Sequence, residues 1–458
     1  MADIKYGSLS ISSMTEFGGR IILIDILAVF FGLSSWMEIN GLWVELPVLL
    51  QVLPEGWSLA SYIVVITQIA NLGPIIYTLA CRKWSSRKLE IPVIYFTLSI
   101  GITSCFLLTF LWSKTSVVFG NLHSTALLSL AFLLAFVDCT SSVLYLPFMA
   151  HYKEKYLLSY LIGEGMSGLL PGIVALIQGV GGNAKCKLVN NTNTTKWIQY
   201  SDPPLFSAET FFGILTFLMI MSGLSFIFLH LLPQIKEEKV MSTTIVPIIF
   251  KKNCDENFDS QSSEQSISSE TQTRASLVKS RVLNKRRFVT LLAFQVFCCA
   301  LTNGVLPAIQ TYSCLPYGNV AYHLSVTLSS IANPLACFVA MFFPTKSLPL
   351  ISLQMVIGTG WSVYIMTAAV TSPSPPLIHT TAGVILIILS WICFVSLLSY
   401  VKACSTSILR QEGSHFAMMW CGGISQIGSA TGALIVLLLV TFTNIFQSYD
   451  VCKSYHAE

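Results

Sequence analysis

Eleven apolar runs, each long enough to cross a membrane as a helix, dominate this chain of 458 residues. A hydrocarbon layer about 30 Å thick needs roughly 20 apolar residues in helical form. Only 10% of the residues are charged, against about 25% in soluble proteins. The sequence therefore predicts an all-α polytopic membrane protein. The predicted spans are 22–46, 59–81, 91–112, 122–149, 156–179, 208–232, 288–311, 320–343, 348–371, 380–403 and 414–446.

A polar segment separates the first six spans from the last five. Residues 233–287 are rich in Ser, Gln and Glu, and we expect them to form a disordered cytosolic loop because such a composition cannot bury a core. The flanking spans predict a six-helix bundle over 22–232 and a five-helix bundle over 288–446. Residues 1–21 and 447–458 are the termini.

The distribution of Lys and Arg predicts the orientation. With the N-terminus in the cytosol, most of the 26 Lys and Arg residues fall in cytosolic segments, as the positive-inside rule requires. Lys402 is then placed at a cytosolic helix end. Because the number of spans is odd, the C-terminus and the loop 180–207 lie outside. Asn190 and Asn193 begin two sequons in that loop and are predicted glycosylation sites.

Cysteine usage allows little disulfide chemistry. Cys186, Cys314 and Cys452 fall outside the predicted spans, where disulfides persist, so at most one bridge can form among them and its pairing stays open. Most of the other Cys residues lie in or beside spans and are expected to be reduced. No Cys/His spacing suggests a metal site, and we predict no metal or cofactor.

The end of the first span is unusually polar, with two Trp, an Asn and two Glu within ten residues. Polar and charged groups at the bilayer centre are costly and usually face a cavity or a partner. Trp36, Asn40 and Trp43 share one narrow helical face at spacings of four and three. We interpret this face as part of a lined pathway. The alternative is an interfacial aromatic belt with a packed amide.

Acidic and imidazole side chains also occur within spans. Glu38 and Glu45 lie on the face opposite the Trp residues, and Glu45 is near the helix end, where we expect it to reach water. Asp138 is far from both ends of its span, so it serves either function or a helix–helix hydrogen bond. Glu164 is a candidate protonatable group or gate contact. His323, near the outer end of its span, is either a hydrogen-bonded structural residue or a proton sensor.

The remaining polar residues of the spans describe a substrate. They are amides, hydroxyls and aromatic rings, among them Asn303, Gln310, Tyr322, Asn333 and Trp420. A phosphate or carboxylate substrate would require Arg or Lys deep in a span, and the predicted spans place none there. An inorganic cation would not need so many aromatic rings. A planar, uncharged, hydrogen-bonding heterocycle fits better.

Short segments spread over nearly every span resemble the animal riboflavin transporters and keep their order. The resembling segments are SWMEINGLWVELP at 35–47, LPEGW at 53–57, QIANLGP at 68–74, VDCTSSV at 137–143, GEGMSGLLPG at 163–172, LTNGVLP at 301–307, QTYSCLPYG at 310–318, AYHL at 321–324, ANPLA at 332–336 and SYVK at 399–402. The resemblance implies a plasma-membrane carrier for riboflavin with a two-bundle helical fold similar to major-facilitator-type carriers. It implies sodium-independent uptake, which mild acid favours in some members.

The resemblance also assigns roles to residues. It implies a substrate pocket made by Asn40, Trp43, Asp138, Asn303, Gln310 and Asn333, with Tyr312, Tyr322 and Trp420 as stacking or gating residues. Glu164, His323 and Glu45 are candidates for proton-linked or gating roles. Glu55, in an outer loop, is expected to have a structural or mouth role. The expected partners are riboflavin and the lipid bilayer, with no nucleic acid and no obligate protein partner.

Three other functions are compatible with the residues. A nucleoside or nucleobase carrier would bind a similarly planar and neutral substrate. A membrane receptor without transport would share the polar spans. A membrane enzyme is the third alternative, although we find no metal or nucleophile constellation for one.

Overall fold

The computed structural model describes residues 16–17, 20–83, 86–118, 120–149, 151–183, 185–191, 194–200, 202–232, 285–412 and 415–448. Ten helices among them are long and apolar enough to cross a membrane, and the count is eleven if the bent pair α1–α2 forms one span. Residues 1–15, most of the predicted loop 233–287 and residues 449–458 lie outside the described part of the chain.

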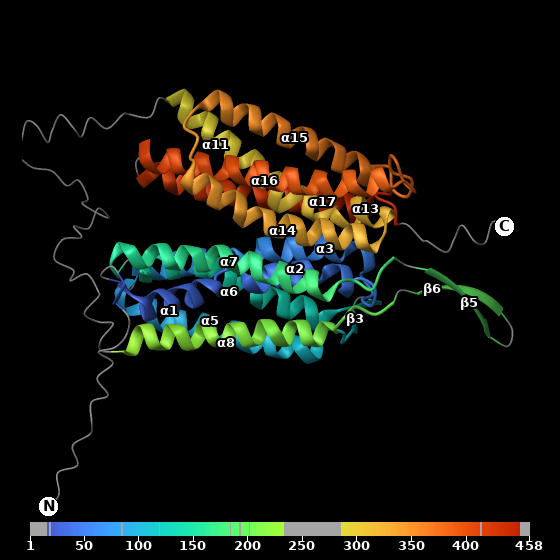
Figure 1. Ribbon diagram of the computed structural model, residues 1–458, viewed down its shortest axis with the longest axis horizontal. Coiled ribbons are helices and arrows are strands. Elements are labelled where there is room, and N and C mark those ends of the chain that lie inside the picture. Colours follow the sequence, from blue (N-terminus) through green and yellow to red (C-terminus); the bar gives the residue numbers. More distant parts are fainter. Residues whose placement is uncertain are drawn as a thin grey trace, which may run out of the picture.

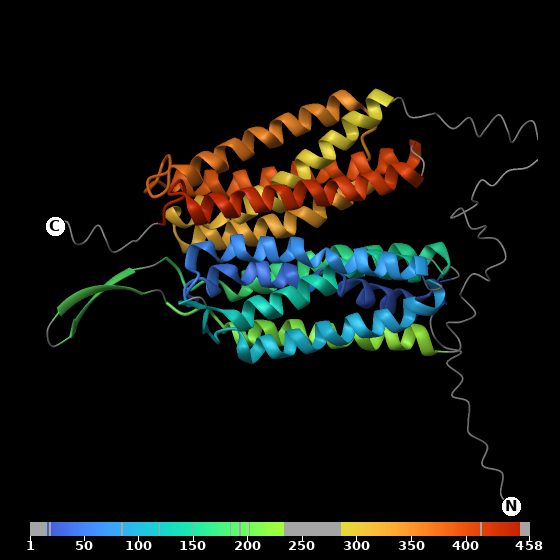
Figure 2. The same cartoon turned by 180° about the vertical axis from the view of Figure 1, so that it is seen from behind.

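The helices form two groups that lie one above the other (Figures 1 and 2). The N-terminal bundle contains α1 (Ile22–Leu33), α2 (Met37–Leu49), η1 (Gly56–Ser58), α3 (Leu59–Ala70), α4 (Leu72–Lys83), α5 (Ser86–Leu111), α6 (Thr125–Met149), α7 (Glu154–Gln178) and α8 (Ala208–Leu231). The C-terminal bundle contains α11 (Lys285–Cys299), the π-helical turn η2 (Ala300–Val305), α12 (Leu306–Ala308), α13 (Gln310–Cys314), η3 (Leu315–Tyr317), α14 (Asn319–Phe342), α15 (Leu348–Val370), α16 (Thr381–Glu412) and α17 (His415–Phe442).

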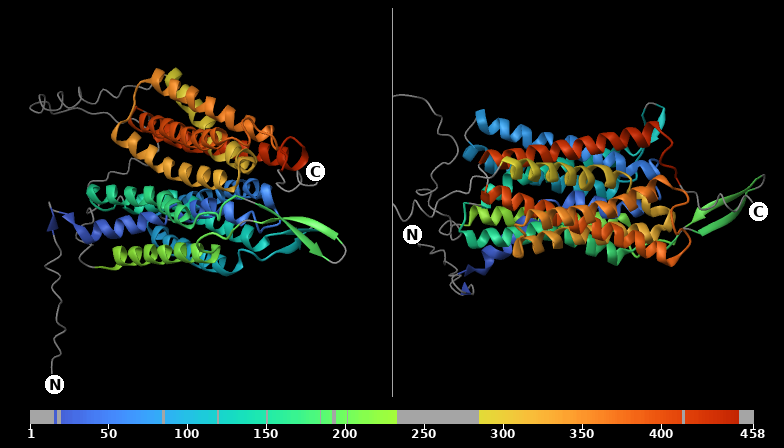
Figure 3. Two further views of the ribbon diagram at one scale, coloured as in Figure 1. Left: turned by 45° about the vertical axis from the view of Figure 1, so that its right-hand side comes forward. Right: turned by 90° about the horizontal axis from the view of Figure 1, so that it is seen from above.

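Three antiparallel strand pairs complete the described structure. They are β1 (Glu16–Phe17) with β2 (Arg20–Ile21), β3 (Ser116–Val118) with β4 (Asn121–His123), and β5 (Lys185–Asn191) with β6 (Thr194–Tyr200). The β5–β6 hairpin occupies the predicted outer loop 180–207 and projects beyond one end of the helices (Figures 1 and 3). We call this the hairpin end, and we call the opposite end, where α8 ends and α11 begins, the loop end.

The first span is broken rather than continuous. α1 and α2 meet at a 53° bend, and Trp36 stands before α2 with a non-helical φ of −141°. The prediction of one helix over 22–46, with Trp36 on the face of Asn40, is therefore wrong. The backbone groups freed by the bend are bonded by side chains of α6, because Asp138 Oδ2 accepts from Ile39 N–H at 2.8 Å and Ser141 Oγ donates to the Ser35 carbonyl at 2.7 Å.

Glycine allows α1 and α7 to approach closely. A Cβ at Gly163 would lie 2.1 Å from the Val29 carbonyl oxygen, and a Cβ at Gly32 would lie 2.3 Å from the Tyr160 carbonyl oxygen. Small residues at such crossings let helix backbones make contact within a membrane. The N-terminal bundle is thus fixed around the bend by direct backbone contact.

Candidate functional site

A chain of polar side chains crosses from one bundle to the other at η2. Lys402 Nζ donates to Thr302 Oγ1 at 3.0 Å, and the Thr302 hydroxyl donates to Asn303 Oδ1 at 3.1 Å. Asn303 Nδ2 in turn donates to Ser429 Oγ at 3.4 Å. From the N-terminal bundle, Gln68 Nε2 donates to the backbone carbonyl oxygen of Asn303 at 3.3 Å. Elements α3, η2, α16 and α17 therefore meet at Asn303, whose side chain stays exposed.

The π-helical geometry of η2 explains why these groups are available. A π turn inserts an extra residue into the helical ladder and is frequent at functional sites. Gly304 lets α17 approach, since a Cβ there would lie 2.6 Å from the Ser429 carbonyl oxygen. Thr302 and Asn303 precede this contact. The π form of this turn was not predicted from the sequence.

Asn40 and Asn333 lie where three helices of the two bundles come together. A Cβ on Gly168 of α7 would lie 3.4 Å from Asn40 Nδ2 and 3.7 Å from Pro334 Cγ of α14. Asn333, just before that proline, is exposed and accepts from Ser399 Oγ at 2.6 Å. The structure thus brings the predicted residues Asn40, Asn303 and Asn333 to the boundary between the bundles.

Hydrogen bonds and rings join the bundles at the hairpin end. Trp43 Nε1 donates to Gln310 Oε1 at 3.2 Å, and Thr311 Oγ1 donates to the Trp57 carbonyl at 2.7 Å. The Trp57 and Tyr312 rings lie 5.6 Å apart. Burial raises the pKa of Tyr312 to about 12, so its ring stays neutral at physiological pH. Trp43, Gln310 and Tyr312 therefore lie in a contact between bundles.

Asp138 has a different place, inside the N-terminal bundle. It is 0% exposed, and its carboxyl group faces that of Glu38, which is 1% exposed. Glu38 Oε1 also packs against α5, where a Cβ at Gly101 would lie 2.1 Å away. Among the described residues, no hydrogen bond reaches Glu38 Oε1, Glu38 Oε2 or Asp138 Oδ1. The structure does not bring Asp138 to the bundle boundary with Asn303.

Glu45 is sealed from water. It is 0% exposed, and its Oε1 accepts from Gln178 Nε2 at 3.0 Å, which ties α2 to α7. The expectation that Glu45 reaches water is therefore wrong, because α7 covers the end of α2. Glu164, also on α7, is partly buried.

Three other predicted residues are dispersed over the C-terminal bundle. Tyr322 is 0% exposed in the core of that bundle, and His323 beside it is 5% exposed in the first turns of α14. Trp420 lies near the start of α17, away from Asn303, and is 46% exposed. The described ring neighbours of Tyr312 are Trp57 and Phe446.

Lys402 corrects the sequence analysis. α16 continues to Glu412, so Lys402 lies ten residues, or about 15 Å, before the end of its helix. The apolar span itself continues to Leu409. Polar residues after Lys402 suggested an early membrane boundary, and the prediction of a cytosolic helix end is wrong. The continued helical pattern up to Leu409 was the signal for a deeper position.

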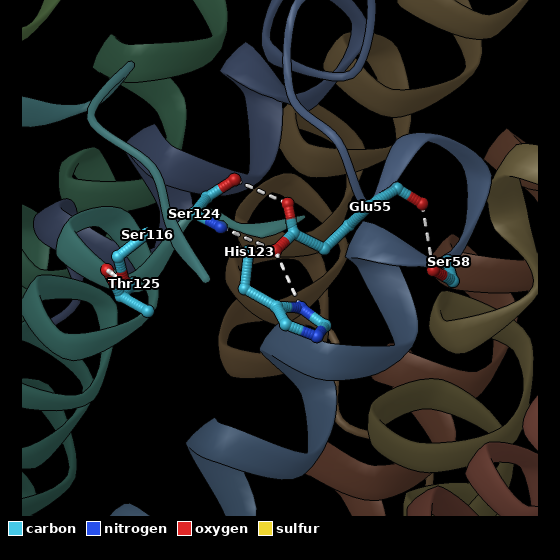
Figure 4. Close-up of polar contacts among 6 residues, drawn as sticks. All are labelled: Glu55, Ser58, Ser116, His123, Ser124 and Thr125. Atoms are coloured by element: carbon cyan, nitrogen blue, oxygen red, sulfur yellow. Dashed lines mark hydrogen bonds and ion pairs between the residues drawn. The ribbon is translucent and has the colours of Figure 1, made fainter. Parts of the chain in front are cut away.

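Glu55 fastens the hairpin end of the N-terminal bundle (Figure 4). Its side chain is 1% exposed and accepts from both the backbone N–H, at 2.7 Å, and the hydroxyl of Ser124, the residue before α6. His123 Nδ1 lies 3.3 Å from the same carboxylate. Negative charge at a helix N-terminus is stabilising. Glu55 thus holds the loop after α2 against the start of α6.

The outer cysteines and sequons are partly described. Cys186 is disulfide-bonded, whereas Cys314 is free and buried, so Cys314 is not its partner. Asn190 lies in β5, and Asn193 lies outside the described residues. Within the described residues, no group of three or more His, Cys, Asp or Glu side chains could hold a metal ion.

Comparisons of sequence place these features in a family. The profile described as solute carrier family 52, riboflavin transporter, matches residues 20–448. A riboflavin transporter of this family, member 3-B from Danio rerio, is 43% identical over 446 residues and covers 94% of this chain and 98% of its own length. Member 3 from Homo sapiens is 38% identical over 468 residues, with 94% and 98% covered.

Comparisons of structure agree on the fold. A mutant of the nucleoside transporter NupG aligns with a TM-score of 0.53 at 13% identity and covers 93% of this chain and 94% of its own. A D-xylose–proton symporter aligns with a TM-score of 0.54 at 12% identity, with 92% and 89% covered. The chain therefore has the two-bundle helical fold of major-facilitator-type carriers, as predicted.

Proposed function

The chain belongs to solute carrier family 52, the riboflavin transporters, and from this membership we propose that it takes up riboflavin across the plasma membrane. It is a carrier by family and by fold rather than an enzyme. Riboflavin has a planar, uncharged ring and a chain of hydroxyls, so it is recognised by hydrogen-bond donors and acceptors. The observation that carries the proposal is the polar chain at Asn303, which joins both bundles through donors and acceptors of that kind.

The mechanism we propose is alternating access. The contacts Trp43–Gln310 and Thr311–Trp57 close the hairpin end. Each is one neutral hydrogen bond with a net worth of about 1 kcal/mol, so few bonds need to break for the bundles to separate there. We propose that the hairpin end is extracellular and the N-terminus cytosolic, as the Lys and Arg distribution predicts. The conformation described here then releases substrate toward the cytosol.

We further propose that uptake does not depend on sodium. A hard cation is held by several oxygen ligands, often carboxylates. The side chains around Asn303 are instead Gln68, Thr302, Ser429 and the Lys402 ammonium, which would repel a cation.

The test is uptake of labelled riboflavin by cells expressing the protein, in sodium and in sodium-free buffer. We expect saturable uptake that is equal in both buffers and that excess adenosine does not inhibit. Asn303→Ala should raise the KM for riboflavin about tenfold, because it removes two hydrogen bonds to the substrate, one from the amide N–H and one to the amide oxygen. Asn121→Ala, an exposed position in β4, is the matched control and should have no effect. Inhibition by adenosine would favour a nucleoside carrier, and absence of uptake with the protein at the surface would favour a receptor.

A further inference from the structure

Lys402 is a cation within a membrane span that has only part of its hydrogen-bonding capacity used. Its ammonium group has three N–H donors, and Thr302 Oγ1 accepts one at 3.0 Å. Within the described residues, no carboxylate oxygen lies within 4.0 Å of its Nζ in a salt bridge. Such a charge is costly in a membrane unless it faces water, a partner or a substrate.

The surroundings of Lys402 show which side is open. Cys298 of α11 and Cys337 of α14 lie near its ammonium group. Cys337 is exposed, as are Asn333, one turn earlier on α14, and Asn303. Glu164 of α7, an acid across the boundary, also lies near Cys337. The ammonium group thus borders the same accessible boundary as the amides of the candidate site.

Thr302 couples the lysine to that site. Its hydroxyl accepts from Lys402 and donates to Asn303 Oδ1 at 3.1 Å, so one residue orients both groups. Asn303 keeps a second N–H and a second lone pair for a ligand. An ammonium group and an amide held side by side match the carbonyl and N–H groups along one edge of a flavin ring.

We propose that Lys402 is a substrate-contacting residue that donates a charged hydrogen bond to a ring carbonyl oxygen of the bound heterocycle. The proposal rests on riboflavin being the substrate and adds the specificity of the site to it. A buried donor left without its acceptor is strongly unfavourable, so the site rejects planar rings that lack a carbonyl at this position. The ribityl hydroxyls are recognised elsewhere and do not touch Lys402.

The test compares two ligands on the full-length protein, purified in detergent, by quenching of flavin fluorescence. Riboflavin carries the ring and the ribityl chain, whereas lumiflavin carries the ring with a methyl group in its place. We expect Lys402→Gln to weaken binding of both ligands by the same factor, about tenfold or more, as for a charged hydrogen bond. Lys402→Arg should restore part of the affinity. Lys346→Gln, at an exposed loop position, is the matched control and should bind both ligands normally.

Unchanged binding of both ligands by Lys402→Gln, or weakened binding of riboflavin alone, would overturn the proposal. If the wild-type protein binds lumiflavin but neither binds nor transports riboflavin, the proposed function fails while the ring contact is still measured. If Lys402→Gln does not fold, alkylation of the neighbouring Cys337 decides, read as the difference between wild type and Cys337→Ser. Lumiflavin should slow this alkylation at least severalfold, and no protection would overturn the contact.

Discussion

Two irregular helical segments, one in each bundle, carry polar side chains within the spans. These side chains are buried in one segment and exposed in the other. At the α1–α2 bend, the freed backbone groups are bonded by Asp138 and Ser141, and Asp138 and Glu38 are sealed from solvent. At η2, the backbone carbonyl of Asn303 accepts a hydrogen bond from Gln68 of the other bundle, and the Asn303 side chain remains exposed. We therefore propose that an irregular helix marks a substrate site where its polar groups remain exposed at the boundary between the bundles.

The difference also separates two reasons for a polar residue in a membrane. In the N-terminal bundle, polar side chains bond the backbone groups that the bend leaves without helical partners. Removing these side chains should lower the stability of the fold. At the bundle boundary, we propose that polar side chains bind the ligand, so removing them should lower affinity. The Asp138 and Asn333 variants below are each expected to change either the stability of the fold or the affinity for substrate, and to leave the other nearly constant.

The largest effect is expected where the N-terminal bundle is held by backbone contact. Gly163→Leu would place a Cβ 2.1 Å from the Val29 carbonyl oxygen, so α1 and α7 must separate. We expect almost no folded protein at the cell surface, because overpacking combined with a backbone shift exceeds the usual cost of about 1–3 kcal/mol. Surface biotinylation measures it. Gly423→Ala, where no atom lies within 4 Å of the added Cβ, is the control. Normal surface levels of Gly163→Leu would show that this region is not rigid.

Asp138→Leu tests whether the buried acid stabilises the fold. It leaves the Ile39 N–H buried without its acceptor, at a cost of about 1–3 kcal/mol. We expect a lower unfolding temperature in detergent, with an unchanged KM for riboflavin in the protein that reaches the surface. Asp138→Asn keeps an acceptor oxygen and should lose less stability. A raised KM at normal thermal stability would instead place Asp138 in the pocket and break the comparison.

Asn333→Ala tests the boundary in the same way. Asn333 is exposed and has one described partner side chain, Ser399, so its loss should disturb the C-terminal bundle little. We expect the KM for riboflavin to rise about fivefold, as for one lost hydrogen bond, with an unfolding temperature close to that of the wild type. Ser399→Ala, which frees the amide without removing it, should have a smaller effect. Equal losses of stability in Asn333→Ala and Asp138→Leu would mean that the two regions do not differ.

The sequence predicts the span pattern well, because a span is recognised by the length of its apolar run. Helix geometry and membrane thickness set that length, and both act within a single segment of the chain. Through their motifs, the sequence also singles out Asn40, Asn303 and Asn333, which the structure places at the boundary between the bundles. It does not separate Asp138 from them, since burial inside a bundle or between bundles depends on which helices pack together. Lys402 was misplaced for a related reason, because polar residues that follow it belong to a helix covered by its neighbours.

The smallest effect is expected at the closed hairpin end, where hydrogen bonds between neutral groups join the bundles. Thr311→Val removes the hydrogen bond to the Trp57 carbonyl, which joins the bundles, and keeps the side-chain volume. A loss of about 1 kcal/mol shifts the balance between the two conformations roughly fivefold. We therefore expect a change of at most about threefold in the maximal uptake rate, with normal stability and unchanged inhibition by lumiflavin. Thr311→Ser keeps the hydroxyl and should behave as wild type, so an equal change in both variants would show that the methyl group, not the hydrogen bond, holds this end closed.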